Sequence, residues 1–372
     1  MEKVRVGITG SSGFIGSHLV TRLKQDKNIQ VIPFEKNYFK DRGKLEGFVA
    51  KCDVLVHLAA MNRGDENELY NINVELVKTI VSAMEITGAM PHVIFASSTQ
   101  YLLNNAYGIS KKEAAKILEE WALKNSSPLS ILIIPNVFGE QCKPFYNSVV
   151  ATFCYQLTHG EIPKIHVNSE VELIYINELT EIIHRIILNP PEMTKELRIS
   201  GTKKNIVSEL LSILEKFKDL YFIKKTVPVL ENLFLSNLYK VFISYVNYDD
   251  YRKTPEIHDD ERGRLFEIIK FEEGGQIFFS TTRPCAIRGN HYHTRKIERF
   301  CIIKGEAVVR LRRIGTEKVI EYFISKNEPT FIEIPVFHAH NIENIGKEDL
   351  YTLIWSNELF NPDDADTFFE KV

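Results

Sequence analysis

The chain has 372 residues, a net charge of −3 at pH 7 and 26% charged residues, a composition ordinary for globular proteins. Its length exceeds the roughly 250–300 residues at which a single hydrophobic core stops growing, so two domains are expected. The charge excludes the basic surface typical of nucleic-acid binding, and no apolar run approaches the roughly 20 residues of a membrane span.

The first 218 residues alternate short apolar strands with amphipathic helices. The predicted strands cover residues 3–9, 30–34, 53–58, 92–96 and 130–134. The predicted helices cover residues 14–26, 67–88, 108–125, 177–188 and 205–217. Such alternation is typical of βαβ units and of a doubly wound parallel sheet.

The pattern changes after residue 258. Residues 219–255 are rich in aromatic side chains, and we interpret them as helical packing elements and a connector. Beyond them, short strands such as 276–280, 307–311, 320–324 and 350–355 are separated by glycine, asparagine and lysine turns. This predicts an all-β sandwich or barrel. We expect an α/β Rossmann domain over residues 1–250 and an all-β domain over residues 251–372.

The ends and cysteines of the chain indicate its compartment. The five cysteines are scattered without a CxxC pair, which is typical of reduced thiols rather than of a disulfide framework. The N-terminus enters a strand pattern at once, which leaves no room for a signal peptide. We therefore expect a cytoplasmic protein.

A glycine-rich turn, residues 10–16, follows the first predicted strand and opens the first helix. Glycine permits a tight turn and lets backbone N–H groups approach a pyrophosphate, and the helix N-terminus adds unpaired donors and partial positive charge. A turn that only needs glycine is the plain alternative, but the strand–turn–helix context favours dinucleotide binding. The residues expected to contact the cofactor here are Gly10, Ser12, Gly13, Phe14, Ile15 and Gly16.

Tyr107 and Lys111 lie at positions i and i+4 of a predicted helix and therefore share one face. A tyrosine with an ordinary pKa near 10 is a poor acid or base at neutral pH, but a nearby ammonium is expected to bring that pKa toward the working range. Ser98, at the end of the preceding strand, is placed to hydrogen-bond a substrate oxygen. The ordered set of glycine turn, strand-end serine and Tyr-x-x-x-Lys resembles the catalytic set of a reductase family, and that resemblance implies hydride transfer to a carbonyl.

These features, with their GxxGxxG spacing, resemble the extended short-chain dehydrogenase/reductase family. The resemblance implies that Lys111 also holds the nicotinamide ribose. Two departures are visible: the gap between Ser98 and Tyr107 is short, and isoleucine (Ile133, Ile134) replaces the usual arginine before Pro135. The resemblance further implies that Leu58, Ala59 and Ala60 lie near the adenine ring and that Asn73 steadies the third helix of the cofactor site. It also implies that Pro135, on the cofactor side, and Asn136, on the substrate side, form the loop between nicotinamide and substrate.

The end of the second strand governs the choice of cofactor. An acidic residue there would hydrogen-bond the ribose 2′-OH of NAD, and a basic residue would accept the 2′-phosphate of NADP. The chain offers both, as Glu35 and Lys36. We predict NADP, bound through Lys36.

The C-terminal part carries a second group of polar residues, spaced HxHx4E and followed by a later histidine: His291, His293, Glu298 and His340. Alternation along a strand places the first two histidines on one face. Three imidazoles and one carboxylate suit a divalent transition metal such as zinc. The spacing resembles the two cupin motifs, with Phe337 where glycine is usual. The alternative is a metal-free cupin whose histidines bind substrate.

The same residues carry a second resemblance. Arg288-Gly289-Asn290-His291 is similar to the RGxH motif of deoxysugar nucleotide 3,5-epimerases. That resemblance implies that His291 is a base beside a 4-keto group and that Arg288 binds substrate. His291 is thus either a metal ligand or a base, because a neutral imidazole cannot readily ligate a metal and accept a proton through the same nitrogen.

A short-chain reductase followed by a cupin resembles a family of bifunctional capsular polysaccharide enzymes. The resemblance implies C3 epimerisation of a UDP-4-keto-6-deoxy-N-acetylhexosamine, then NADPH-dependent reduction at C4 to UDP-N-acetyl-6-deoxy-L-talosamine, a precursor of UDP-N-acetyl-L-fucosamine. Because cupin edges often pair, a homodimer is expected. The alternatives are a simple 4-ketoreductase with a non-catalytic, dimerising cupin, and a non-enzymatic NADP-sensing protein.

Overall fold

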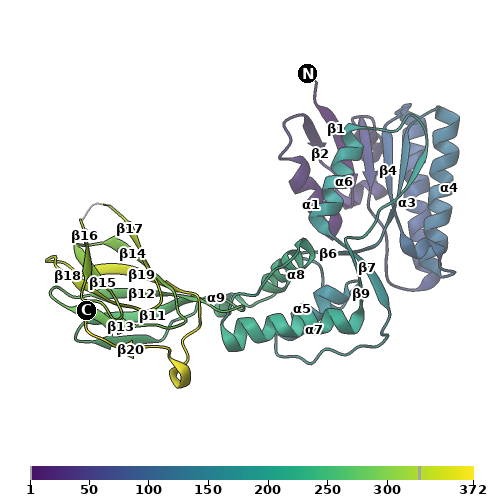
Figure 1. Ribbon diagram of the computed structural model, residues 1–372. Coiled ribbons are helices and arrows are strands. Elements are labelled where there is room, and N and C mark those ends of the chain that lie inside the picture. The colour runs from purple at the N-terminus through teal and green to yellow at the C-terminus, as the bar shows by residue number, and fades with distance from the viewer. Residues whose placement is uncertain (1, 326–327) are drawn as a thin grey trace. The chain divides into compact units, whose positions relative to one another are not determined.

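The computed structural model describes residues 2–325 and 328–372 (Figure 1). The chain divides into two compact units. The first, called here the α/β unit, comprises residues up to 215 together with 232–246. The second, the β unit, comprises residues 216–231 and 247–372. The packing of residues 216–231 with the second unit could not be predicted from the periodicity of the sequence.

The α/β unit is built on a six-stranded sheet whose neighbouring strands all run parallel. Strand order changes direction at β1, which has β2 on one side and β3 on the other. Ligands of open α/β sheets bind at such a switch point, outside the carboxyl ends of the strands. In spatial order the strands are β2 (Ile29–Ile32), β1 (Val4–Thr9), β3 (Val54–His57), β4 (His92–Ser98), β5 (Leu129–Ile134) and β8 (Lys195–Arg198).

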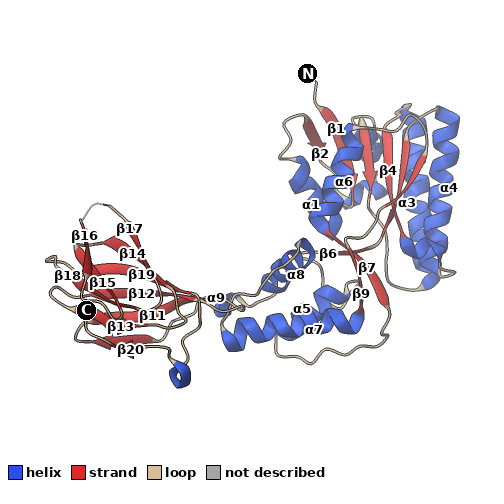
Figure 2. Ribbon diagram, in the orientation of Figure 1, coloured by secondary structure: helices blue, strands red, loops and turns tan. Residues whose placement is uncertain are grey.

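Helices cover both faces of this sheet, which confirms the doubly wound prediction (Figure 2). On one face, α1 (Phe14–Leu23) and α6 (Ile176–Leu188) bury a stripe that includes Leu19 and Ile183. On the other, α3 (Glu66–Thr87) and α4 (Ala106–Asn125) bury Ile80 and Trp121. Removing such side chains from water is the main stabilising contribution to this unit.

Several elements of the α/β unit were not predicted from the sequence. A small sheet joins β6 (Asn136–Phe138), β7 (Glu170–Tyr175) and β9 (Lys203–Ile206). Because β9 pairs with β7, helix α7 (Val207–Lys218) begins two residues later than the predicted start at 205. The helices α2 (Arg42–Val49) and α5 (Val149–Thr158) were also missed. The aromatic-rich segment forms the π-helical turn Asp219–Lys224, α8 (Leu233–Ser244) and α9 (Tyr248–Tyr251), in agreement with its expected helical character.

The β unit consists of two antiparallel sheets. The first has the order β10 (Ile257–Asp260), β11 (Gly263–Lys270), β12 (Gln276–Thr282), β19 (Leu350–Ser356), β14 (Glu298–Lys304), β17 (Thr330–Ile334). The second has the order β16 (Val319–Ile324), β15 (Ala307–Arg313), β18 (His338–Asn344), β13 (Ile287–Tyr292), β20 (Phe368–Phe369). Phe300 and Ile302 of the first sheet pack with Val309 and Ile342 of the second in one core. The all-β prediction is confirmed.

The cysteines and the helices bear on two further expectations from the sequence. All five cysteines are free thiols, as the scattered spacing predicted. None of the helices within residues 2–325 and 328–372 has the length and apolar character needed to cross a bilayer.

Candidate functional site

The glycine turn of the α/β unit leaves the start of α1 open. Gly10 has φ +73°, and a side chain at Gly16 would lie 2.1 Å from the carbonyl oxygen of Gly10, so neither position tolerates another residue. Gly13 precedes α1 and provides no side-chain cap. The first N–H groups of the helix therefore lack a side-chain acceptor, which is the arrangement that binds a phosphate.

The loop after β3 is held in place beside this turn. The Asn73 side chain accepts a hydrogen bond from the Met61 N–H (2.7 Å) and donates to the Met61 carbonyl (2.9 Å) and to Ser110 Oγ (3.1 Å). The Ala59 N–H donates to Thr9 Oγ1 at 3.4 Å. The Asn73 amide is thus bonded to protein groups on both sides and links helix α3 to the loop after β3 and to α4.

Ser98, Tyr107 and Lys111 are placed by adjacent ends of β4 and α4. Ser98 is the last residue of β4, and its Oγ accepts a hydrogen bond from the Gln100 N–H (3.2 Å). Lys111 is 4% exposed, and its Nζ donates to the carbonyl of Ala96 in β4 (2.9 Å). The same Nζ lies 5.6 Å from the centre of the Tyr107 ring.

The expectation that Lys111 lowers the pKa of Tyr107 is wrong for the protein alone. Burial, and then the nearby Tyr146, raise the pKa of Tyr107 to about 12. Burial also lowers the pKa of Lys111 to about 8. The reason is geometric, because the ammonium is bonded to the Ala96 carbonyl in a desolvated position. Tyr107 is therefore protonated at neutral pH, which is the state that a proton donor needs.

Glu35 and Lys36 stand side by side after β2, both exposed, at the start of a 3₁₀ turn, Lys36–Lys40. The Ser11 hydroxyl donates to the carbonyl of the preceding Phe34 at 3.4 Å, which links this segment to the glycine turn. Either side chain is thus available near a ribose bound at the turn, and the preference for Lys36 stays a prediction.

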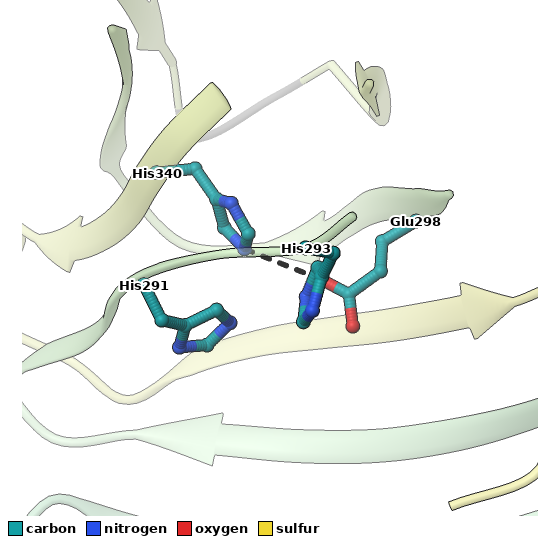
Figure 3. Close-up of side chains that lie close together, drawn as sticks. All are labelled: His291, His293, Glu298 and His340. Carbon is teal, nitrogen blue, oxygen red and sulfur yellow. Dashed lines mark ion pairs between the residues drawn. The ribbon is translucent and has the colours of Figure 1, made fainter. Parts of the chain in front are cut away.

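The β unit brings all four predicted metal ligands together. One ligand atom from each of His291, His293, Glu298 and His340 lies within 4.8 Å of the others. Figure 3 shows the four side chains turned toward one another. His291 and His340 come from β13 and β18 of one sheet, and Glu298 begins β14 of the other. Glu298 Oε2 is 3.5 Å from His293 Nε2 and 3.3 Å from His340 Nε2.

The hydrogen bonds of these histidines fit a metal centre. His293 Nδ1 donates to the Asp366 carbonyl (2.6 Å), and His340 Nδ1 donates to the His338 carbonyl (3.1 Å). Each ring then presents the lone pair of Nε2 toward Glu298, and both Nε2 atoms are buried without a hydrogen-bond partner. Unpaired buried nitrogens are uncommon in folded proteins. Imidazoles whose other nitrogen is bonded to a carbonyl are the usual ligands of zinc.

The charges of the cluster agree with this fit. Burial alone would raise the pKa of Glu298, but the nearby imidazoles of His293 and His340 hold that pKa well below its usual range. Burial, together with His340, lowers the pKa of His291 to about 3. Glu298 is thus an anion and His291 is neutral, the protonation states in which these groups bind a divalent metal.

A bulge in β13 brings His291 into the cluster. The pairing with β18 shifts register between Gly289 and His291, so that His291 lies opposite His340. Gly289 (φ +100°) and Asn290 (φ +62°) adopt the conformation that this requires. Arg288, just before the bulge, has a buried Nε without a hydrogen-bond partner. Phe337, where the cupin motif has glycine, has φ +56°.

Known proteins match both units and the chain as a whole. The NAD dependent epimerase/dehydratase family matches residues 6–199, and the polysaccharide biosynthesis C-terminal domain matches residues 258–368. A UDP-2-acetamido-2,6-beta-L-arabino-hexul-4-ose reductase of Pseudomonas aeruginosa is 31% identical over 369 residues, 98% of each chain. The crystal structure of the capsular polysaccharide assembling protein CapF from Staphylococcus aureus superposes with a TM-score of 0.88 at 31% identity, covering 99% of this chain and 100% of that one.

This chain belongs to the CapF family. Both relatives match over both units, and the chain is accordingly a nicotinamide-dependent oxidoreductase acting on nucleotide sugars. The α/β unit also shares its fold with RMD from Pseudomonas aeruginosa complexed with NADPH, at a TM-score of 0.52 and 17% identity over 58% of this chain and 83% of that one.

In this CapF-family chain, one group beside Tyr107 was not predicted from the sequence. The ring of Tyr146 lies 5.8 Å from the Arg63 guanidinium and 5.8 Å from Lys143 Nζ. Arg63 also donates to the Phe145 carbonyl (2.9 Å), which joins the loop after β3 to the loop after β6. These residues follow no helical or strand periodicity. The one sequence feature that could have drawn attention to them is the aromatic pair Phe145-Tyr146 in the loop between β6 and α5. Tyr146, which helps to raise the pKa of Tyr107, thus has two cations near its ring.

Proposed function

We propose that the chain epimerises C3 of a UDP-4-keto-6-deoxy-N-acetylhexosamine in its β unit and reduces C4 with NADPH in its α/β unit. The product would be UDP-N-acetyl-6-deoxy-L-talosamine, used for capsule or O-antigen synthesis. The observation that supports the proposal is the presence, in one chain, of two different groups of candidate residues: the open glycine turn with Tyr107 and Lys111, and the buried cluster around Glu298.

The reductase half follows from the state of Tyr107. When bound, NADPH supplies the hydride for C4. The new oxygen at C4 then needs one proton, and a tyrosine with a pKa of about 12 holds that proton on its phenolic oxygen at neutral pH. Ser98 is proposed to hold the same oxygen by a hydrogen bond. Lys111, with a pKa of about 8, keeps a positive charge near the reacting oxygen in neutral solution.

The proposed epimerase activity depends on the chemistry of the substrate and on the residue cluster of the β unit. A 4-keto group acidifies the hydrogen on C3, so a base can remove that proton and return one to the other face. We propose that the buried cluster holds zinc through His291, His293, Glu298 and His340, since all four lie within reach of one ion. A bound divalent metal supplies a positive charge that polarises a carbonyl. Arg288, with its unpaired Nε, is proposed to bind the substrate.

The assignment of His291 has its own test, because the two motif resemblances assign it differently. If His291 is a ligand, His291→Gln loses metal affinity together with C3 exchange. If His291 is the base, the same variant keeps its metal and loses exchange alone. The grouping of His291 Nδ1 or Nε2 with the other three ligand atoms supports the first result.

The reductase assignment is tested with [4-²H]NADPH and a UDP-4-keto-6-deoxy-N-acetylhexosamine. We expect one NADPH consumed per sugar and deuterium at C4 of a product whose C3 is inverted, as read by NMR coupling constants. Reduction without inversion at C3 would support the simple ketoreductase with a dimerising β unit. Binding of NADPH without turnover of any 4-keto sugar would support the NADP-sensing alternative. Gel filtration with light scattering tests the proposed homodimer, and the proposed location is the cytoplasm.

A further inference from the structure

The C-terminal segment of the β unit packs against the loop that joins two of the proposed metal ligands. This loop comprises residues 293–297, so it begins with His293 and ends just before Glu298. The carboxylate of Asp366 accepts hydrogen bonds from three consecutive N–H groups of the loop, those of Thr294 (3.1 Å), Arg295 (2.8 Å) and Lys296 (2.9 Å). It also accepts one from Thr294 Oγ1 at 2.6 Å. Successive N–H groups around one carboxylate form an anion-binding nest of the backbone.

The main chain of Asp366 acts on the metal ligand itself. Its carbonyl oxygen accepts the hydrogen bond from His293 Nδ1 (2.6 Å), which fixes the ring as the tautomer whose Nε2 lone pair is directed toward Glu298. Asp366 has φ +43° and is 6% exposed. An aspartate holds that strained conformation only where surrounding contacts determine it. Here the side chain and the carbonyl of one residue both bind the same loop.

Further contacts extend this hold to both sides of Asp366. The ammonium of Lys296 donates to the Ala365 carbonyl, and Arg295 pairs with Asp364 at 2.9 Å. Downstream, β20 pairs with β13, with Phe369 opposite His291. The segment from Asp364 to Phe369 therefore contacts the backbone around both His291 and His293.

We infer that Asp366 is a positioning residue for the metal centre, which it completes by locking the 293–297 loop and the tautomer of His293. The inference rests on the metal site of the proposed function and adds the C-terminal segment to it. Hydrogen-bonded partners of ligating histidines change metal affinity by about 10–100-fold when they are removed. The carboxylate of Asp366 holds the loop on which His293 stands and fixes the position of the carbonyl bonded to His293 Nδ1, so we expect its removal to have an effect of this size even though Asp366 provides no ligand.

The test is a Co²⁺ titration of the full chain against a competing chelator, with the visible d–d spectrum recorded at each step. Asp366→Ala is expected to weaken Co²⁺ binding about 100-fold and to alter the absorption bands, and Asp366→Asn is expected to weaken it about tenfold. Asp363→Asn is the matched control, since Asp363 is exposed immediately before this segment, and it should leave affinity and spectrum unchanged.

Metal-free far-UV circular dichroism and NADPH binding show whether each variant keeps its fold. If Asp366→Ala unfolds the β unit, the milder Asp366→Asn variant decides. A Co²⁺ affinity within twofold of the wild type and an unchanged spectrum in the folded variant would overturn the inference while leaving the metal site intact. Failure of the wild type to bind Co²⁺ or Zn²⁺ would instead overturn the metal site and this inference together.

Discussion

The two candidate sites differ in where their polar groups come from. At the glycine turn of the α/β unit, the donors are backbone N–H groups left open by Gly13, and the proposed chemistry depends on the half-buried Tyr107 and the buried Lys111. In the β unit, the site is made of three side chains from two sheets and of His293 from the loop between them, and the members of the cluster influence one another's charge states. Burial is therefore the main cause of the pKa shifts at the first site, whereas at the second site burial acts together with the other members of the cluster.

This difference has a consequence for how each site responds to substitution. A group tuned by burial keeps its environment when its neighbour is changed, so single substitutions in the α/β unit should remove one function and leave the rest. Groups tuned by each other lose their protonation states together, so one substitution in the β unit should disable the whole cluster. Substitutions at each of the two sites test that contrast.

Replacing Tyr107 with phenylalanine should separate the two sites. Because the variant lacks the phenolic proton, NADPH-dependent reduction at C4 is expected to fall on the order of 10³-fold. Exchange of the C3 hydrogen with solvent, followed by NMR without NADPH, should continue at the wild-type rate. Tyr101→Phe, whose hydroxyl contacts Glu196, serves as a control. Loss of both activities in Tyr107→Phe would contradict two separate centres.

Replacing His340 with glutamine should disable the β unit. Removing a ligand is expected to weaken Zn²⁺ binding by more than about 100-fold, a larger loss than that from an outer partner, and to stop C3 exchange. NADPH binding by the α/β unit should be unaffected. His338→Gln is a matched control on the same strand, since its side chain lies outside the four-residue cluster. Equal zinc affinity in the two variants would refute the assigned ligand set.

Lys111→Met should stabilise the protein while removing reductase activity. The folded-state pKa of about 8 lies below the ordinary value of 10.5, so the folded protein binds the Lys111 proton more weakly than the unfolded chain does. The resulting penalty is complete below pH 8 and disappears as the pH rises from 8 to 10.5. After allowing for the lost bond to the Ala96 carbonyl, we expect a gain of about 2 kcal/mol at pH 7.

Thermal unfolding of wild type and Lys111→Met at pH 7 and pH 10 measures this gain. The difference between the two proteins should shrink at the higher pH. A variant less stable than the wild type at pH 7 would mean that the hydrogen bond to Ala96 outweighs the cost of burying the charge.

The smallest effect concerns the choice of cofactor. Lys36→Ala should raise the KM for NADPH about tenfold, because a charged hydrogen bond to the 2′-phosphate contributes roughly 1.5–3 kcal/mol. The KM for NADH should not change. Lys40→Ala, at the other end of the same 3₁₀ turn, controls for the general loss of positive charge. Parallel changes for both cofactors would show that Lys36 does not read the phosphate.

The positions of the candidate residues in the α/β unit could be predicted because these residues lie where a predicted strand ends or a predicted helix begins. The glycine turn lies between a strand and a helix, and Ser98 ends a strand, so chemistry and position are visible in one short segment. The four metal-cluster residues were found by motif spacing. The partner of His293 was not, because Asp366 lies 72 residues beyond the Thr294 that it binds, and no periodicity connects them.

Other features could not be predicted because they too depend on contacts between residues far apart in the sequence. The strands β7 and β9 are short and polar in part, so their pairing depends on each other rather than on a hydrophobic pattern. The raised pKa of Tyr107 depends on how deeply the ring is buried and on the direction of one ammonium. The spacing Tyr-x-x-x-Lys specifies neither quantity.

Solvent labelling tests the central claim, that one chain carries out two reactions at two sites, most directly. The wild-type protein is incubated in D₂O with NADPH and a UDP-4-keto-6-deoxy-N-acetylhexosamine, and the product is analysed by NMR. We predict deuterium at C3, introduced by exchange in the β unit, and protium at C4, delivered from NADPH in the α/β unit. A reduced product that retains protium at C3 would contradict the account.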